Sequence, residues 1–240
     1  MTARPDRPLV PMPLVRGARG AVVAPHHLAT AAGLAILRAG GTAVDAAIAT
    51  NAVLGVVQPS GCGLGGDAFW LIWDEAAGRQ TALNGSGRAP ARADAAGLRA
   101  GGLATLPHRG PLAIAVPGAV RSWDDAHRRH GRLSRAEVLG PAIELAWAGF
   151  PAWDGFIEAV EGVLPAVVEA LGAGSGFERV YRPHGRPWRP GERVRLPALA
   201  STLERLAEVG FDDFYEGETA ERQAAGLRAI DCLVGLEDLR

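Results

Sequence analysis

Three glycines in the first third of the chain have the spacing of a dinucleotide-binding loop. Gly61, Gly63 and Gly66 form the pattern G-x-G-x-x-G. In a dinucleotide site this loop follows a strand and opens a helix, so that the pyrophosphate lies at the helix N-terminus. Here the order is reversed, because residues 41–59 have the pattern of a helix and residues 68–74 that of a strand. A phosphate-binding P-loop is also excluded, since it needs a lysine and the chain contains none.

The glycine loop therefore predicts a helix-to-strand connection in which the backbone approaches something closely. Two interpretations stay open with nearly equal weight. The loop either shapes the floor of a substrate pocket or is a purely structural turn. Asp67, at the end of the loop, either caps nearby backbone N–H groups or faces solvent.

Cys62 lies within the glycine loop, where a nucleophilic thiol could be presented. A cysteine amidase also needs a histidine base and a group that orients it. Nothing in the sequence links Cys62 to His26, His27 or His108. We therefore interpret Cys62 as a small loop residue.

His127 and His130 are three residues apart on an expected helix and could form a metal-binding pair. The sequence offers no third ligand, and the two arginines between the histidines disfavour a cation. We expect a solvated basic helix end, no metal site and no cofactor.

A stretch rich in arginine could form a nucleic-acid patch with stacking aromatic residues. It contains Arg179, Tyr181, Arg182, Arg186, Trp188, Arg189, Arg193 and Arg195. The prolines in this stretch and the net charge of −1 for the whole chain favour a surface loop or hairpin instead. We expect neither nucleic acid nor an anionic membrane as a partner.

The composition is that of an ordinary globular protein. Of 240 residues, 48% are hydrophobic and 21% are charged, which is enough chain for one large core or two small ones. Two cysteines are too few for a disulfide framework. The first 20 residues lack the apolar core of a signal peptide, so we expect a cytoplasmic location.

We expect several helices to position the candidate functional residues. A helix begins near His27 and ends at Gly40. Thr42 caps the next helix, which is apolar nearly all round and should be buried on several sides. Further helices are expected between residue 119 and Gly131, and from a capping box at 134–137. We expect Pro141 to end that short helix and to begin the next one. The segment 197–210 places three leucines on one helix face: Leu199, Leu203 and Leu206.

Few strands accompany these helices. Residues 68–74 are apolar on both faces, which predicts a central strand covered on both sides, and residues 81–87 complete a hairpin. Another short strand is expected within 110–120, and a loop or short hairpin within 171–196. The pattern predicts an α+β fold with a layered helix–sheet core. These strands are few for a sheet covered on both faces, so we expect the N-terminal portion of something larger.

After residue 20 the chain resembles the gamma-glutamyltransferase family. The resemblance lies in consecutive blocks, namely APHHLATAAGLAILRAGGTAVDAAIATNAVLGVVQP, GLGGDAFWLIWD, GRAPA, VPGAV, GPAIELAWAGF and LPALASTLERLAEVGFDDFYEGE through to LEDLR. Residues 1–20 are expected to be an irregular lead-in. Residues 21–240 would be the N-terminal part of the family's large subunit.

The resemblance implies an N-terminal-nucleophile hydrolase fold, an αββα sandwich that is incomplete in this chain. Family members are made as precursors that cut themselves, and the new N-terminal threonine of the small subunit is the nucleophile. That threonine is absent from this chain, so we expect no catalytic residue here and no activity of this chain alone. The implied partners are the small subunit and a gamma-glutamyl or other small amide substrate.

Other functions within and beyond the family stay open. This chain has Ser86 at the position where the family has a substrate-binding arginine. That departure favours a broader branch of the family, which includes relatives similar to oxamate amidohydrolase or cephalosporin acylase. A non-catalytic relative that keeps only the scaffold is the alternative from another class.

One substrate-binding residue of the family can be placed on this sequence in part. The family's large subunit carries an arginine shortly before an Ala-Pro pair, and that arginine binds the α-carboxylate of the acyl donor. At the aligned position this chain has Ser86, and the nearby arginine is Arg88. A guanidinium suits a carboxylate because it offers paired donors in one plane. We expect Arg88, with Ser86 beside it, to face the substrate.

Overall fold

The computed structural model describes residues 16–240. The first 15 residues of the expected irregular lead-in lie outside the described residues. Residues 16–20 contain neither helix nor strand, as expected for that part of the segment.

Helices dominate the described part of the chain, and each begins and ends as follows. The α-helices are α1 His27–Arg38, α2 Ala43–Val57, α3 Ala95–Ala100, α4 Ala119–His130, α5 Arg135–Ala148, α6 Asp154–Leu171, α7 Gly176–Tyr181, α8 Pro197–Glu208, α9 Asp213–Glu216, α10 Glu218–Arg228 and α11 Leu236–Leu239, and the 3-10 helix η1 is Pro111–Ala113. The strands are β1 Ala68–Asp74, β2 Arg79–Gly85, β3 Phe150–Pro151 and β4 Arg193–Val194.

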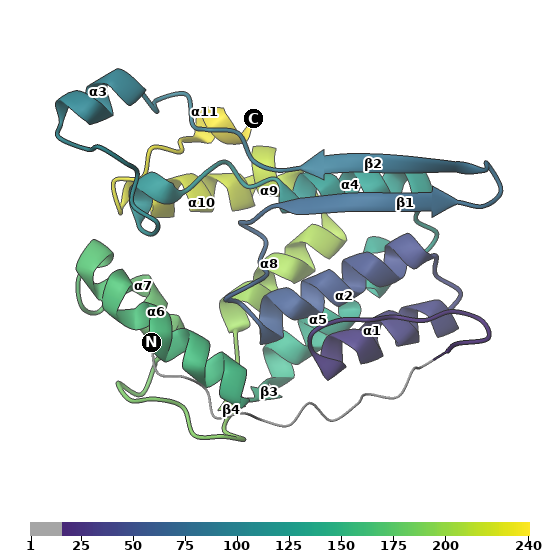
Figure 1. The fold of residues 1–240 in the computed structure, drawn as a ribbon. Coiled ribbons are helices and arrows are strands. Elements are labelled where there is room, and N and C mark those ends of the chain that lie inside the picture. Colours follow the sequence, from purple (N-terminus) through teal and green to yellow (C-terminus); the bar gives the residue numbers. More distant parts are fainter. Residues whose placement is uncertain (1–15) are drawn as a thin grey trace.

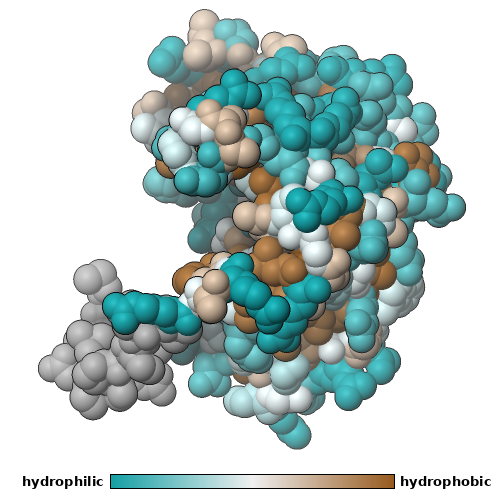
Figure 2. All heavy atoms as spheres, turned by 90° about the vertical axis from the view of Figure 1, so that its right-hand side faces the viewer, coloured by the Kyte–Doolittle hydropathy of each residue, from teal (hydrophilic) through white to brown (hydrophobic). Residues whose placement is uncertain are grey.

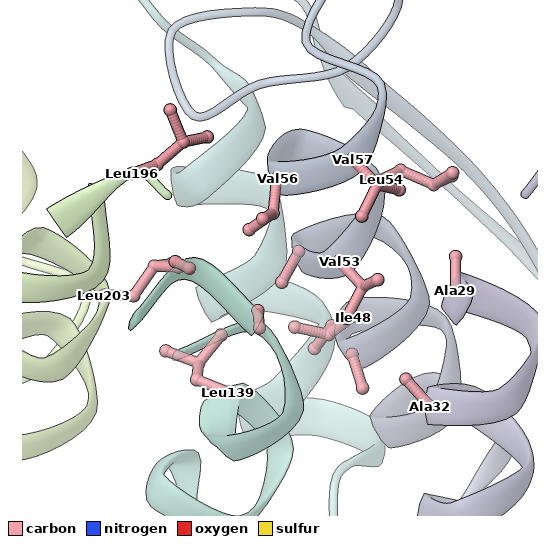
Figure 3. Packing of buried hydrophobic residues seen from close by; sticks show 14 of the residues in the cluster. Ala29, Ala32, Ile48, Val53, Leu54, Val56, Val57, Leu139, Leu196 and Leu203 are labelled. Atoms are coloured by element: carbon pink, nitrogen blue, oxygen red, sulfur yellow. The ribbon is translucent and has the colours of Figure 1, made fainter. Parts of the chain in front are cut away.

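Helix α2 lies at the centre of the core. Eleven of its fifteen residues are buried, which confirms the prediction from its apolar sequence. Its side chains meet those of α1 on one side and those of α5 and α8 on the other (Figure 3). Leu203 and Leu206 of α8 are buried and Leu199 is half-buried, so the expected leucine face of that helix is also present.

Capping boxes begin α2 and α5, as their sequences predict. Thr42 accepts a hydrogen bond from the N–H of Asp45, and the Asp45 carboxylate accepts one from the N–H of Thr42 at 2.8 Å. Ser134 and Glu137 make the same reciprocal pair at the start of α5. The two boxes differ in burial, because Asp45 is fully buried and Glu137 is exposed.

Proline 141 does not end a helix, so that expectation was wrong. Helix α5 runs without interruption through Pro141. The proline removes the hydrogen bond to the carbonyl of Glu137, which lies in the exposed first turn, where water can replace it. Buried residues around the proline, among them Leu139 and Ala142, hold the helix against its neighbours.

Strands β1 and β2 form the expected antiparallel hairpin, with Leu71 opposite Ala82. The expectation that both faces of β1 are covered was wrong for the described chain. Trp70 and Ile72 pack against the core, whereas Phe69, Leu71 and Trp73 on the other face are 71%, 77% and 60% exposed. An apolar run indicates that both faces avoid water but does not say which segment covers each one.

Two further expectations need correction. The segment 110–120 forms the 3-10 helix η1 followed by backbone outside any sheet, because its two prolines remove the donors that a strand ladder needs. Residues 171–196 contain helix α7, and strand β4 in this stretch pairs with β3, far away in sequence, instead of closing a local hairpin.

Figure 1 shows the hairpin above the helices of the core, with α4 lying against it. Helices α6 and α7 extend to one side of this core, and α3, α10 and α11 lie near the end of the hairpin that is opposite its turn. Within residues 16–240, no helix combines the length and apolar character needed to cross a membrane.

Candidate functional site

The glycine loop meets the N-terminus of α4 in space, although it precedes a strand in sequence. The carbonyl of Gly66 accepts hydrogen bonds from the N–H groups of Gly118 and Ala119, at 3.1 and 2.9 Å. These are two of the N–H groups that a helix leaves without partners in its first turn. The loop thus caps α4, and these two N–H groups point at protein backbone.

Asp67 joins this loop to the second glycine loop, which follows β2. Its carboxylate accepts a hydrogen bond from the N–H of Gly87 at 2.8 Å. The carbonyl of Arg88 in turn accepts a hydrogen bond from the N–H of Val116 at 3.0 Å. Of the two roles considered for Asp67, the backbone-capping role is the one in the structure. The segment that carries Ser86 and Arg88 is therefore held on both sides.

Glycine is needed where these segments cross. A Cβ atom at Gly87 would lie 1.6 Å from the carbonyl oxygen of Val116, and one at Gly118 would lie 2.3 Å from the carbonyl oxygen of Gly85. Both obstacles are backbone atoms that cannot rotate away. The close backbone approach expected of a glycine loop is therefore present, and it fixes the position of residues 86–88.

These contacts form one wall of a polar hollow of about 290 Å³. Both site residues predicted from the sequence, Ser86 and Arg88, line it. The side chains that join them from other elements are Arg121, Ser122, Asp125, Tyr215, Asp238 and Arg240. Sequence reasoning missed these residues, because α4, α9 and α11 are distant in sequence and no local pattern marks their meeting.

The guanidinium of Arg88 reaches the C-terminal helix α11. Its Nη2 donates to the carbonyl oxygen of Asp238 at 2.8 Å, and its Nη1 lies 3.9 Å from the Asp238 carboxylate. Burial would raise the pKa of Asp238, but N–H groups of Gly235 and Ala91 and the Arg88 charge bring it below its ordinary value. Nearby Asp94 caps α3 with its side chain. The Arg88 side chain stays 57% exposed toward the hollow.

A second arginine of the hollow, Arg121, is held by α9. Its guanidinium lies 4.3 Å from the centre of the Tyr215 ring and forms an ion pair with Asp212. Its backbone N–H donates to the Tyr215 hydroxyl at 2.8 Å. Burial raises the pKa of Tyr215 to about 12, so this hydroxyl keeps its proton at neutral pH. With Arg240, three arginines line the hollow beside Asp125 and Asp238, and their guanidiniums suit recognition of an anion.

The thiol of Cys62 has the environment of a structural cysteine. Burial raises its pKa, which disfavours the reactive thiolate. Asn51 is a polar neighbour, and its Nδ2 lies 3.9 Å from the sulfur. His26, one of the bases considered for Cys62, instead accepts a hydrogen bond from Leu28 and caps α1.

The solvated basic helix end expected of α4 is present only in part, because Arg128 and Arg129 are exposed whereas the two histidines are not fully so. His127 is partly buried, with Nε2 2.8 Å from the carbonyl oxygen of Leu133 and 3.7 Å from the Asp45 carboxylate. Its ring also lies edge-on to Phe211. Residues 16–240 contain no group of three or more side chains placed to hold a metal ion.

Two of the six arginines in the arginine-rich stretch are paired with carboxylates. Arg186 binds Glu192 with two hydrogen bonds, and Arg182 forms an ion pair with Glu161. Trp188 is only 8% exposed, so its ring offers no open stacking surface for a base.

Comparison with known proteins identifies relatives along nearly the whole chain. Residues 29–240 match the family model described as gamma-glutamyltranspeptidase. The oxamate amidohydrolase proenzyme of Klebsiella pneumoniae is 41% identical over 92% of this chain and 42% of its own length. The glutathione hydrolase-like YwrD proenzyme of Bacillus subtilis is 37% identical over 94% of this chain and 42% of its own length. The chain thus spans about two fifths of the length of these curated relatives.

Solved structures are also similar to nearly the whole of this chain. A cephalosporin acylase from Bacillus halodurans is 34% identical, with a TM-score of 0.83 over 98% of this chain and 45% of that one. A gamma-glutamyltranspeptidase from Pseudomonas nitroreducens, complexed with L-DON, is 33% identical, with a TM-score of 0.81 over 93% of this chain and 65% of that one.

Proposed function

This chain belongs to the gamma-glutamyltranspeptidase family and corresponds to the N-terminal part of its large subunit, and we propose that the whole protein is an amide-cleaving N-terminal-nucleophile hydrolase. The proenzyme names of the relatives support a precursor that is processed into two subunits. The small subunit would then be the partner of this chain and would carry the nucleophilic threonine.

The proposed chemistry divides between the two subunits. A threonine hydroxyl is a weak nucleophile, but the α-amine of an N-terminal threonine, with a pKa near 8, can act as its base. Backbone N–H groups would stabilise the oxyanion of the tetrahedral intermediate. The residues described here would contribute positioning, through the rigidly held segment 86–88.

The proposed substrate is a small amide that carries a carboxylate. The observation behind this proposal is that Arg88 opens into the polar hollow from a loop held by Asp67 and Val116. A gamma-glutamyl amide and oxamate each combine an amide with a carboxylate, so a guanidinium suits both. The identity of 41% with an oxamate amidohydrolase and the serine at position 86 favour a small amide acid over a gamma-glutamyl donor.

Turnover by the complete, processed protein tests the proposal. Release of ammonia from oxamate should exceed release of p-nitroaniline from gamma-glutamyl-p-nitroanilide. The reverse preference would support the glutathione hydrolase side of the family. A correctly processed protein that cleaves neither these amides nor a wider panel of small amide acids would contradict the enzymatic proposal and support a non-catalytic scaffold. The cytoplasmic location stays a prediction, which cell fractionation would test.

A further inference from the structure

An apolar cleft of about 460 Å³ lies between α6, α7 and the segment that carries η1. One face of α6 lines it with Phe156, Val160, Val163 and Val167, which are spaced four, three and four residues apart. That spacing puts the four side chains in one row along the helix. The cleft shares no lining residue with the polar hollow around Arg88.

Aromatic rings form a second side of the cleft. The rings of Phe177 and Tyr181 in α7 lie 5.1 Å apart, and the ring of Tyr181 lies 6.4 Å from that of Phe156. Burial raises the pKa of Tyr181, so its hydroxyl stays neutral. These walls favour a ligand with an apolar tail, and a flat ring can stack or meet them edge-on.

The charge of the cleft has one sign. Its charged or titratable lining residues are Arg109, His108 and the neutral Tyr181, and no aspartate or glutamate lines it. Glu169 lies with Arg109 along the other side of the 107–112 segment. None of the ion pairs within residues 16–240 includes Arg109. An exposed, unpaired guanidinium beside an apolar cleft repels cations and offers paired donors to a carboxylate.

We propose that this cleft binds a small amphiphilic carboxylate, with its apolar tail along α6 and its carboxylate at Arg109. This goes beyond the proposed amide hydrolysis. It assigns the chain a second small-molecule site, for compounds such as arylalkyl acids. The cleft volume lies within the range of about 300–1,000 Å³ typical of small-molecule sites.

The test uses the complete, processed protein and two probes that differ only in charge. Isothermal titration calorimetry would measure binding of 4-phenylbutyrate and of its neutral amide, 4-phenylbutanamide. The carboxylate should bind about tenfold more tightly, because the amide cannot form the charge-assisted contact with Arg109. Arg109→Gln should remove this difference, and Val163→Trp, which fills the cleft, should abolish binding of both probes. The matched control is Arg99→Gln, which removes another exposed arginine and should leave both affinities unchanged.

Several results would overturn the inference. They are no binding of 4-phenylbutyrate, equal affinity for both probes, or unchanged binding to the Val163→Trp variant with a normal thermal melt. If another segment of the protein fills the cleft, no probe binds and the inference fails. Amide turnover, measured on the same preparation, separates this failure from failure of the proposed enzyme, because it depends on neither Arg109 nor Val163.

Discussion

Arg88 and Arg92 show how single residues tie the loop after β2 to the C-terminal segment. Arg88 donates to the backbone of Asp238 and lines the polar hollow. Arg92 donates to the backbone carbonyls of Cys232 and Leu233 and does not line the hollow. The two arginines thus share an anchoring role, whereas of the two only Arg88 lines the hollow that we propose to receive the substrate. The sequence could indicate Arg88 through its distance from an Ala-Pro pair, but not the residues that surround it.

Replacing Arg88 with alanine should impair catalysis by the processed protein. Loss of a bidentate carboxylate contact should cost about 2–3 kcal/mol in transition-state binding, or roughly 30- to 150-fold in kcat/KM. The loss should be much smaller for an acyl donor without a carboxylate, and Ser86→Ala should have a weaker effect. Arg92→Ala is the control for loosening of the loop. Equal, small losses with both kinds of donor would show that Arg88 does not recognise the substrate.

Gly87→Ala should prevent the loop after β2 from packing against the segment 116–118. The new methyl group would overlap the carbonyl oxygen of Val116, so either the loop or the segment 116–118 must move. We expect a lower thermal midpoint and loss of most activity. Gly63→Ala is the matched control, because no heavy atom lies within 4 Å of its added Cβ. Equal midpoints for the two variants would contradict the close approach described here.

At the scale of elements, the sequence predicted the hairpin and five of the eleven α-helices in the described part of the chain, namely α1, α2, α4, α5 and α8, because caps and apolar spacing are local signals. Thr42 and Ser134 began their helices as expected. Two of the errors share one cause, which is that tertiary contacts decided the outcome. Packing of buried residues keeps α5 helical through Pro141. Strand β4 pairs with β3, more than forty residues away in the sequence.

The two capping boxes allow a comparison of buried and exposed versions of one motif. The Asp45 carboxylate also accepts hydrogen bonds from the N–H groups of Arg132 and Leu133, at 2.9 and 3.3 Å. Asp45→Ala leaves these partly buried donors without their buried partner and should lower the free energy of unfolding by about 3 kcal/mol. Glu137→Ala, in the exposed box, should cost about 1 kcal/mol or less. Urea denaturation of both variants measures the difference, and equal costs would contradict the argument.

Asp213 should make the fold sensitive to acid. Hydrogen bonds from Arg205 lower its pKa from 3.8 to about 2, against the effect of burial, with help from Thr219. Because the folded pKa is lower than the unfolded one, this stabilisation is present above about pH 4 and is lost as the pH falls toward 2. Asp213→Asn should cost about 2 kcal/mol at pH 7 and flatten the pH dependence between pH 4 and 2. An equally steep loss of stability between pH 4 and 2 in the variant would refute this role.

At the scale of the whole molecule, one apolar face of β1 is not covered by the described part of the chain. Figure 2, viewed from the side of the hairpin turn, shows several hydrophobic patches among hydrophilic ones. The apolar sequence of β1 indicated a strand covered on both faces, whereas this chain covers only the face of Trp70 and Ile72. We infer that another part of the whole protein would lie on Phe69, Leu71 and Trp73, as the second sheet of the family's sandwich fold.

Leu71→Glu in the complete precursor should weaken the association of the two subunits, because it places a charge in the proposed covered face. Co-purification of the small subunit with a tagged large subunit measures this effect. Val209→Glu changes another exposed apolar residue, 56% accessible and outside the hairpin, and should leave the association intact. Full retention of the small subunit by the Leu71→Glu variant would show that this face is not covered by a partner.

This chain alone should show no turnover of gamma-glutamyl-p-nitroanilide, because the proposed nucleophile lies on another segment. Its exposed sheet face also favours aggregation. Activity of purified residues 1–240, absent from a mock purification of the same host, would contradict the division of labour between the subunits.

The identity of the N-terminal residue created by processing tests the central claim most directly. The complete reading frame would be expressed, and the products identified by intact-mass spectrometry and N-terminal sequencing. We expect two fragments, of which the larger contains the residues described here and the smaller begins with threonine. A precursor that stays intact, or a junction without threonine, serine or cysteine, would contradict the assignment of this chain to an N-terminal-nucleophile enzyme.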